Sequence, residues 1–247
     1  MKGVLATMGR ELRSYFLSPL GWVVASAFLL YQGISFQVIL DYLNSPDAPP
    51  SLKLWEFVFG GTLFFWMFLL FITSVLTMRL LSEEKRSGTL EMLLTAPVTE
   101  TQVVVGKFLA AITFYMAMWS PTVIYALILE RYTELDWGPV AAGYVGTLGI
   151  GMLLLSVGTF ASALTRNQVV AAVVSFTFLF VLFIPAFLEM LVNDPKWREA
   201  FGYMNLYQHM DEFSKGIVDS RRLLYYLSGT VLFLFLAGRA VDAAKGK

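Results

Sequence analysis

The 247-residue chain is too apolar for a water-soluble domain, because 57% of its residues are hydrophobic and only 15% are charged, against about 25% in soluble domains. Its formal net charge is zero and it has no cysteine, so nothing favours nucleic acid as a partner, and disulfides and thiolate metal sites are excluded. The apolar residues form long runs, and about 20 of them cross a bilayer as a helix. We therefore expect an all-α integral membrane protein with one transmembrane domain over residues 1–247.

Residues 3–18 have the pattern of an amphipathic helix that precedes the first apolar run. Its apolar face, at helical spacing, is formed by Leu5, Met8, Leu12 and Phe16. Such a helix can lie in the cytoplasmic membrane interface, and the Ser18–Pro19 step would then turn the chain into the bilayer. The alternative is that these residues simply extend the first membrane span.

Six runs have the length of a membrane-spanning helix. They are Leu20–Leu40, Phe57–Thr77, Phe108–Leu129, Val140–Leu164, Val169–Leu188 and Leu223–Gly238. None contains a charged residue when Glu189 is placed at the edge of the fifth. Since intramembrane charges usually mark ion or proton paths, a proton-coupled carrier or an ion pump is not favoured.

Three of these spans carry residues that predict helix breaks or close packing. Pro121 in the third span and Pro185 in the fifth each remove a helix hydrogen bond, so we expect a kink or a break there. In the fourth span, Gly143, Thr147 and Gly151 form a stripe of small residues at spacing four. This stripe predicts a close approach of another helix, with a gating role as the alternative.

The distribution of basic residues predicts the orientation. An even number of spans puts both termini on the same side, together with residues 79–107 and 165–168. Of the 18 basic residues, eleven lie on that side and seven on the other, namely Lys53, Arg131, Lys196, Arg198, Lys215, Arg221 and Arg222. Because basic residues favour the cytoplasm, we expect both termini there, in a multi-pass protein of the bacterial inner (plasma) membrane.

The polar segment between the second and third spans, residues 79–107, is unusual in so apolar a chain. Gly88 and Pro97 leave room for about two helical turns, "TLEMLLTA", with Leu90, Leu93 and Leu94 on one side. Full burial of a leucine is worth about 1.5–3 kcal/mol, so this face should meet either lipid headgroups or another protein. After the proline, Thr99 and Gln102 have the spacing of a capping box that would begin the third span.

Residues 193–222, between the fifth and sixth spans, mix aromatic and charged residues at roughly helical spacing. We expect short amphipathic helices that dip into the outer leaflet. The side chains that suggest them are Trp197, Phe201, Met204 and Phe213. Two interpretations stay open for this set: an aromatic belt at the membrane interface, or an external gate.

The sequence offers no catalytic or metal site. His209, the one histidine, lies near Asp211 and Glu212 without the spacing of metal ligands. No phosphate-binding loop of the form G-x-x-x-x-G-K-[ST] occurs. We therefore expect this chain to bind no cofactor and not to be an enzyme by itself; if ATP drives it, another chain must bind the nucleotide.

The stretch "SEEKRSGTLEMLLTAPVTETQVVVGKF" resembles the cytoplasmic loop of type-2 ABC-transporter permeases, in which E-x-x-x-G-T-L-E-x-L-L-x-x-P is followed by G-K at the next span. The N-terminal "RELRSYFLSPLGWVV" and the later "YQHMDEFSKGIVDS" resemble the gliding-motility subgroup of these permeases. The resemblance covers nearly the whole chain, in the same order and with the same six spans.

The resemblance implies a coupling helix between spans two and three that docks on a separate ABC ATPase subunit, which holds ATP and Mg²⁺. Two permeases, as a homodimer or with a sister permease, would join two ATPases in an exporter. It also implies re-entrant external helices between spans five and six. The coupling segment would be formed by Gly88, Thr89, Leu90, Glu91, Leu93, Leu94 and Pro97, with Glu83 and Glu84 beside it.

Two other functions remain open at this stage. The chain could be a membrane anchor that recruits cytoplasmic proteins through residues 79–107 without transporting anything. It could also be a stand-alone channel or lipid scramblase, which would need no ATPase and would give passive flux in liposomes.

Overall fold

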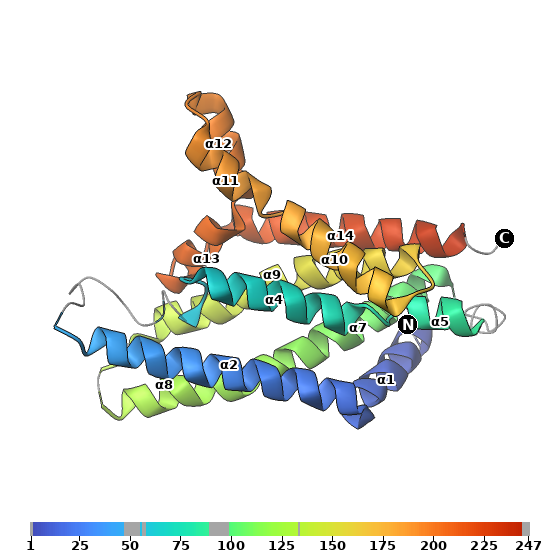
Figure 1. Ribbon diagram of the computed structural model, residues 1–247, viewed down its shortest axis with the longest axis horizontal. Coiled ribbons are helices and arrows are strands. Elements are labelled where there is room, and N and C mark those ends of the chain that lie inside the picture. The colour runs from blue at the N-terminus through green and yellow to red at the C-terminus, as the bar shows by residue number, and fades with distance from the viewer. Residues whose placement is uncertain (1, 47–54, 56–57, 89–98, 133, 244–247) are drawn as a thin grey trace.

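A computed structural model describes residues 2–46, 55, 58–88, 99–132 and 134–243. Within these ranges every regular element is a helix and no strand is present (Figure 1). Six helical stretches are long and apolar enough to cross a membrane, beginning at Pro19, Leu63, Glu100, Trp137, Gln168 and Ser220. The all-α architecture and the number of spans predicted from the sequence are therefore confirmed.

The helices follow in chain order. They are α1 (Lys2–Leu17), α2 (Pro19–Leu43), α4 (Leu63–Thr77), α5 (Ser82–Ser87), α7 (Glu100–Trp119), the 3₁₀ turn η1 (Ser120–Thr122), α8 (Val123–Glu130), α9 (Trp137–Leu164), α10 (Gln168–Val181), α11 (Ile184–Leu191), α12 (Pro195–Met204), α13 (Leu206–Ser214) and α14 (Ser220–Asp242).

The two proline predictions are confirmed. Pro121 lies in the 3₁₀ turn that separates α7 from α8, and Pro185 lies in the first turn of α11, after α10 has ended at Val181. Proline is tolerated at these positions because the first turn of a helix has no internal partner for its N–H. The third and fifth spans are therefore each built from two helices.

The predicted second span, Phe57–Thr77, is wrong at its start. The chain is not helical from Phe59 to Thr62, and α4 begins only at Leu63. Gly60 has a φ of 117°, which L side chains rarely adopt, and the Thr62 side chain then caps α4 by accepting a hydrogen bond from the Phe65 N–H. The break places Phe59 in the core at 1% exposure.

Helix α9 lies at the centre of the bundle and contacts α4, α5, α7, α10, α13 and α14. Its small residues receive aromatic rings from neighbouring segments. A Cβ on Gly143 would lie 2.4 Å from the Phe59 ring, and one on Gly151 would lie 2.4 Å from the Tyr115 ring. The predicted stripe is therefore a packing surface. The groups that approach it closely are aromatic side chains.

Helix α1 is a separate element and not an extension of α2. Ser18 is extended and caps α2, which begins with Pro19, and Figure 1 shows α1 turning away from α2 toward the far side of the bundle. Leu5 and Phe16 remain exposed, whereas Tyr15 is buried and donates a 2.6 Å hydrogen bond to the Leu76 carbonyl.

The two termini lie at the same end of the bundle, beside α5, and α11 and α12 project from the opposite part of the molecule (Figure 1). We call the first the terminal end and the second the distal end. An even number of spans has this consequence, which the sequence also predicted.

Candidate functional site

The segment expected to dock on a partner joins α5 to α7 along the chain. Residues 89–98 are outside the described part of the chain, so the predicted roles of Thr89, Leu90, Glu91, Leu93, Leu94 and Pro97 stay predictions. The structure describes both flanks of the segment. Helix α5 ends at Gly88, which has a φ of 70°, and the expected capping box of Thr99 and Gln102 is present at the start of α7.

Glu83 and Glu84, which were expected to flank the coupling segment, point in different directions. Glu83 is exposed, whereas Glu84 is 9% exposed and pairs with cations of the same chain. Glu83 is thus open to a partner, and Glu84 is occupied inside the protein.

A cluster of four charged residues connects the two helices that flank this segment. Its members are Arg10, Glu11, Glu84 and Lys107. The Lys107 ammonium lies 2.8 Å from Glu11 Oε1 and 3.0 Å from Glu84 Oε1, and Arg10 lies 2.8 Å from the same Glu84 oxygen. The Lys107 side chain is 2% exposed. Two acids and two bases thus neutralise one another, and they tie α1 to α5 and α7.

A close approach of α1 to α7 makes this cluster possible. A Cβ on Gly106 would lie 2.8 Å from Thr7 Cβ and 2.9 Å from the Val4 carbonyl oxygen, so only glycine lets the two backbones come this near. The neighbouring Lys107 can then reach Glu11 on α1. The pair "GK" in the sequence therefore combines a close backbone contact with a buried cation.

Helix α5 is also held from the side of α9. The Ser162 hydroxyl accepts hydrogen bonds of 3.1 Å from the N–H groups of Leu81 and Ser82, and it donates one of 3.1 Å to the Met78 carbonyl. Lys85 donates to the carbonyl of Ala163. These bonds satisfy the backbone where α4 gives way to α5, and they fix the direction in which α5 leaves the bundle.

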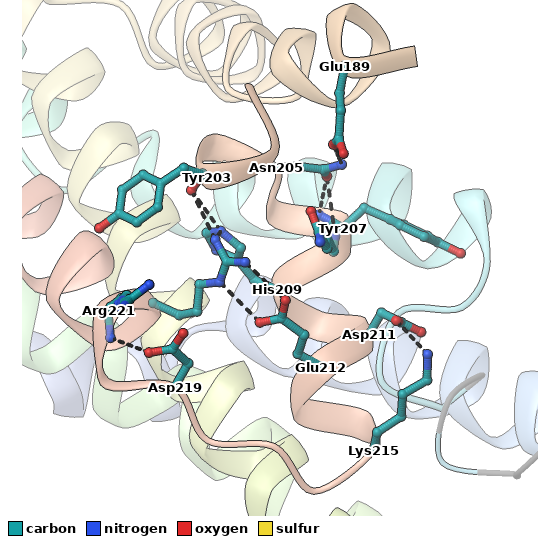
Figure 2. Close-up of polar contacts among 12 residues, drawn as sticks. Glu189, Tyr203, Asn205, Tyr207, His209, Asp211, Glu212, Lys215, Asp219 and Arg221 are labelled. Carbon is teal, nitrogen blue, oxygen red and sulfur yellow. Dashed lines mark hydrogen bonds and ion pairs between the residues drawn. The ribbon is translucent and has the colours of Figure 1, made fainter. Parts of the chain in front are cut away.

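A second polar cluster lies at the distal end, where α13 meets the start of α14 (Figure 2). Arg222 forms a two-pronged ion pair with Glu212, through contacts of 3.0 and 3.1 Å. His209 is fully buried, with Nδ1 3.1 Å from the Tyr226 hydroxyl and Nε2 2.9 Å from Arg222 Nη1. The sequence predicted neither contact, because His209 and Arg222 are neighbours only after α13 has packed beside α14.

Two groups compete for His209 Nε2. Arg222 Nη1, which can only donate, lies 2.9 Å from it, and the Tyr203 carbonyl oxygen, which can only accept, lies 3.0 Å from it. Arg222 Nη1 also donates to this carbonyl at 3.4 Å. Burial first, and then the Arg222 charge, lower the pKa of His209 to about 4. The imidazole is therefore a neutral structural group at physiological pH.

The four aromatic and apolar residues proposed for an external gate do not form one surface. Trp197 and Phe201 stack on α12 with ring centroids 6.1 Å apart, and Met204 is partly exposed at the end of the same helix. Phe213, in contrast, is 0% exposed and packs against Gly146 and Tyr226. The prediction for α12 stays open, while Phe213 belongs to the core.

Comparison with known proteins identifies the type of chain. Residues 6–238 match the family described as "ABC-2 family transporter protein". The chain belongs to the ABC-2 transporter family. This ABC-2 chain is thus a transporter permease domain in a multi-pass membrane protein, as its sequence resemblance implied.

Two curated relatives, from Escherichia coli K12 and from Escherichia coli O157:H7, share the name "Probable multidrug ABC transporter permease YbhR". Each is 25% identical over 144 residues, which is 58% of this ABC-2 chain. The chain spans only 39% of the length of these relatives.

Proposed function

We propose that this ABC-2 chain is the membrane-spanning subunit of an ATP-driven exporter in the bacterial inner membrane, with both termini in the cytoplasm. A separate ATPase, carrying ATP and Mg²⁺, binds at residues 79–107, and a second permease completes the transporter. The main support is the family match, which extends over residues 6–238 and so includes both flanks of the docking segment.

The mechanism follows from the attachment of that segment. Closure of the ATPase pair on ATP moves the two docking segments, and α5 and α7 carry the motion into the second and third spans. The buried Lys107–Glu84 pair supports this step, because it joins α5 directly to α7 and separation of the two helices would break a contact between desolvated charges.

The cargo is proposed to be amphipathic or bulky. The uncharged, aromatic character of the spans suits such molecules better than small ions. The YbhR relatives are named as probable multidrug permeases, and multidrug transport is compatible with this class of cargo. Membership of the gliding-motility subgroup stays a prediction from the sequence resemblance.

The test is purification of the tagged chain from its native membrane in mild detergent, followed by identification of bound ATPase and measurement of ATP hydrolysis. The variant Leu93→Asp/Leu94→Asp should lose the ATPase while keeping the thermal stability of the purified permease. A matched control is Leu191→Asp, at an exposed position of the distal end, which should keep the ATPase. Equal ATPase binding by the double variant and the wild type would overturn the docking assignment and favour the anchor function.

A further inference from the structure

A groove of about 520 Å³ lies at the distal end and is not used by the docking mechanism. Its walls come from α4, α10, α11, α12 and α13. The apolar part is formed by Trp66 and Leu70 of α4 and by Phe183 and Phe187 near the start of α11. A groove of this size with aromatic walls has the dimensions of a site for an apolar chain or small molecule.

The groove is open on the side of the membrane-spanning helices. Leu63, Phe180 and Phe187 line it and are 69%, 45% and 55% exposed. These residues belong to helices long and apolar enough to span a membrane, so we expect their exposed surfaces to meet hydrocarbon. A molecule dissolved in the bilayer can therefore enter from the side.

One end of the groove is charged. Glu189 on α11 and Arg198 on α12 both line it, and within the described residues neither forms an ion pair. The carboxylate of Glu189 accepts one hydrogen bond of 2.7 Å, from the neutral amide of Asn205 (Figure 2). Asp211, a further lining residue, is paired with Lys215 at 2.7 Å.

Two further features belong to this charged end. The side-chain oxygen of Gln208 is buried and has no hydrogen-bond partner within the described residues, which is costly unless a ligand donates to it. Glu189, Arg198 and Gln208 also line an adjoining hollow of about 450 Å³ whose wall includes the exposed Arg221. The apolar groove thus continues into a polar space with separate negative and positive groups.

We propose that this groove binds a phospholipid with an ammonium headgroup, such as phosphatidylethanolamine. One acyl chain lies along Trp66, Leu70 and Phe183. The ammonium group contacts the Glu189 carboxylate and the Gln208 oxygen, and the phosphate contacts Arg198. Guanidinium groups bind phosphate through paired hydrogen bonds. A carboxylate at the edge of a span is stabilised by a nearby cation, and the ammonium group of the same lipid molecule can supply it.

Charge complementarity selects this occupant. An anionic lipid would pair with Arg198 and leave the Glu189 carboxylate without a cation. A simple lipophilic cation would pair with Glu189 and leave Arg198 without an anion. A zwitterionic headgroup satisfies both residues at once. The inference concerns lipid binding alone, so it can be correct or wrong independently of the proposed ATP-driven transport.

The test uses the full permease complex as purified, stripped of lipid by detergent exchange. The complex is incubated with equal amounts of phosphatidylethanolamine and phosphatidylglycerol of identical acyl chains, and the bound lipids are counted by native mass spectrometry. A charge-assisted contact of this kind should favour the ethanolamine lipid by about fivefold. Glu189→Gln should abolish the preference, and Arg198→Gln should lower the binding of both lipids. The control Asp41→Asn, at an exposed position of α2 that lines neither the groove nor the adjoining hollow, should change neither.

Equal binding of the two lipids by the wild type, or an unchanged preference in Glu189→Gln, would overturn the proposal. If Glu189→Gln does not fold, Gln208→Leu provides the same comparison, because it removes the second acceptor for the ammonium group. A complex that binds neither lipid and dissociates into monomers on Phe187→Glu would instead assign the groove to a second copy of the chain, and the proposal would then be wrong.

Discussion

The Lys107 ammonium lies 3.0 Å from Glu84 Oε1, so the helix that precedes residues 89–98 and the helix that follows them are joined by a buried ion pair. Glu11 adds a 2.8 Å contact from α1 to the same ammonium. Removal of one partner from a buried pair costs far more than the pair contributes, because the remaining charge stays desolvated. The two helices that flank the docking segment, α5 and α7, should therefore resist separation from each other.

Replacing Lys107 with methionine should destabilise the protein markedly. The substitution keeps the length of the side chain but removes the buried cation, so that Glu11 and Glu84 share only Arg10, whose side chain is half-exposed. We expect a cost of about 3 kcal/mol, which corresponds to a fall in Tm of about 6–12 °C for a chain of this size. The measurement is thermal unfolding of the purified permease in detergent. The double variant Lys107→Met/Glu84→Gln should recover part of the loss, and a fall in Tm equal to or larger than that of Lys107→Met would contradict this account.

A methyl group at Gly106 should push α1 away from α7. Gly106→Ala places Cβ within 3 Å of both Thr7 and Val4, and overpacking of this kind costs about 1–3 kcal/mol. Gly9→Ala is the matched control, because a Cβ there meets nothing within 4 Å, and alanine in a helix is favoured over glycine by about 0.5–1 kcal/mol. We expect the Tm to fall for Gly106→Ala and to stay equal or rise for Gly9→Ala; a fall in both would point to a cause other than crowding.

Glu83 and Glu84 should give separable effects on docking and on stability. Glu83 is exposed on α5, so Glu83→Lys should weaken co-purification of the ATPase and leave the Tm of the permease unchanged. Glu84→Gln removes a charge that Lys107 and Arg10 share and should lower the Tm. If Glu83→Lys lowers the Tm as much as Glu84→Gln does, the division between an outward-facing and an inward-facing residue is wrong.

Acid should weaken the distal cluster through His209. The pKa of His209 is lowered from 6.5 to about 4, so the unfolded chain binds a proton at a higher pH than the folded one. The corresponding stability is fully present above pH 6.5 and is lost as the pH falls toward 4, in total on the order of 3 kcal/mol. Arg222, Glu212 and Asp219 are the charged groups that face the ring.

The measurement is the Tm of the purified permease between pH 7 and pH 4.5. His209→Gln keeps a donor and an acceptor but cannot titrate in this range, so its Tm should vary less with pH than that of the wild type. Since the chain has one histidine, no other imidazole contributes. Parallel pH curves for the two proteins would show that His209 does not control this dependence.

The helical architecture was predictable because its determinants are local. Runs of about 20 apolar residues require a bilayer, prolines interrupt helices, and the side chains of Thr99 and Gln102 cap a helix that begins beside them. The start of the second span was not predictable from apolarity. The chain carries no charge from Phe57 to Thr77, and a turn at Gly60 decides that Phe59 packs into the core.

The candidate site shows the same division between local and long-range determinants. The chemical character of residues 79–107, a charged segment between two spans, follows from the sequence alone. The sequence does not show which of Glu83 and Glu84 faces inward, because this depends on the crossing of α1 over α7 at Gly106. Lys107, a single cation within an apolar stretch, indicates a buried partner without identifying it.

By itself, then, the sequence determined that the helices are suited to a bilayer, how many spans there are, and where prolines break them, since each of these depends on neighbouring residues. Only the tertiary structure decided that Glu84 pairs with Lys107, that Phe213 is core, and that Glu189 and Arg198 face the same groove. Each of these facts depends on how helices distant in sequence pack against one another, and side-chain volume and charge select that packing through contacts that no local pattern records.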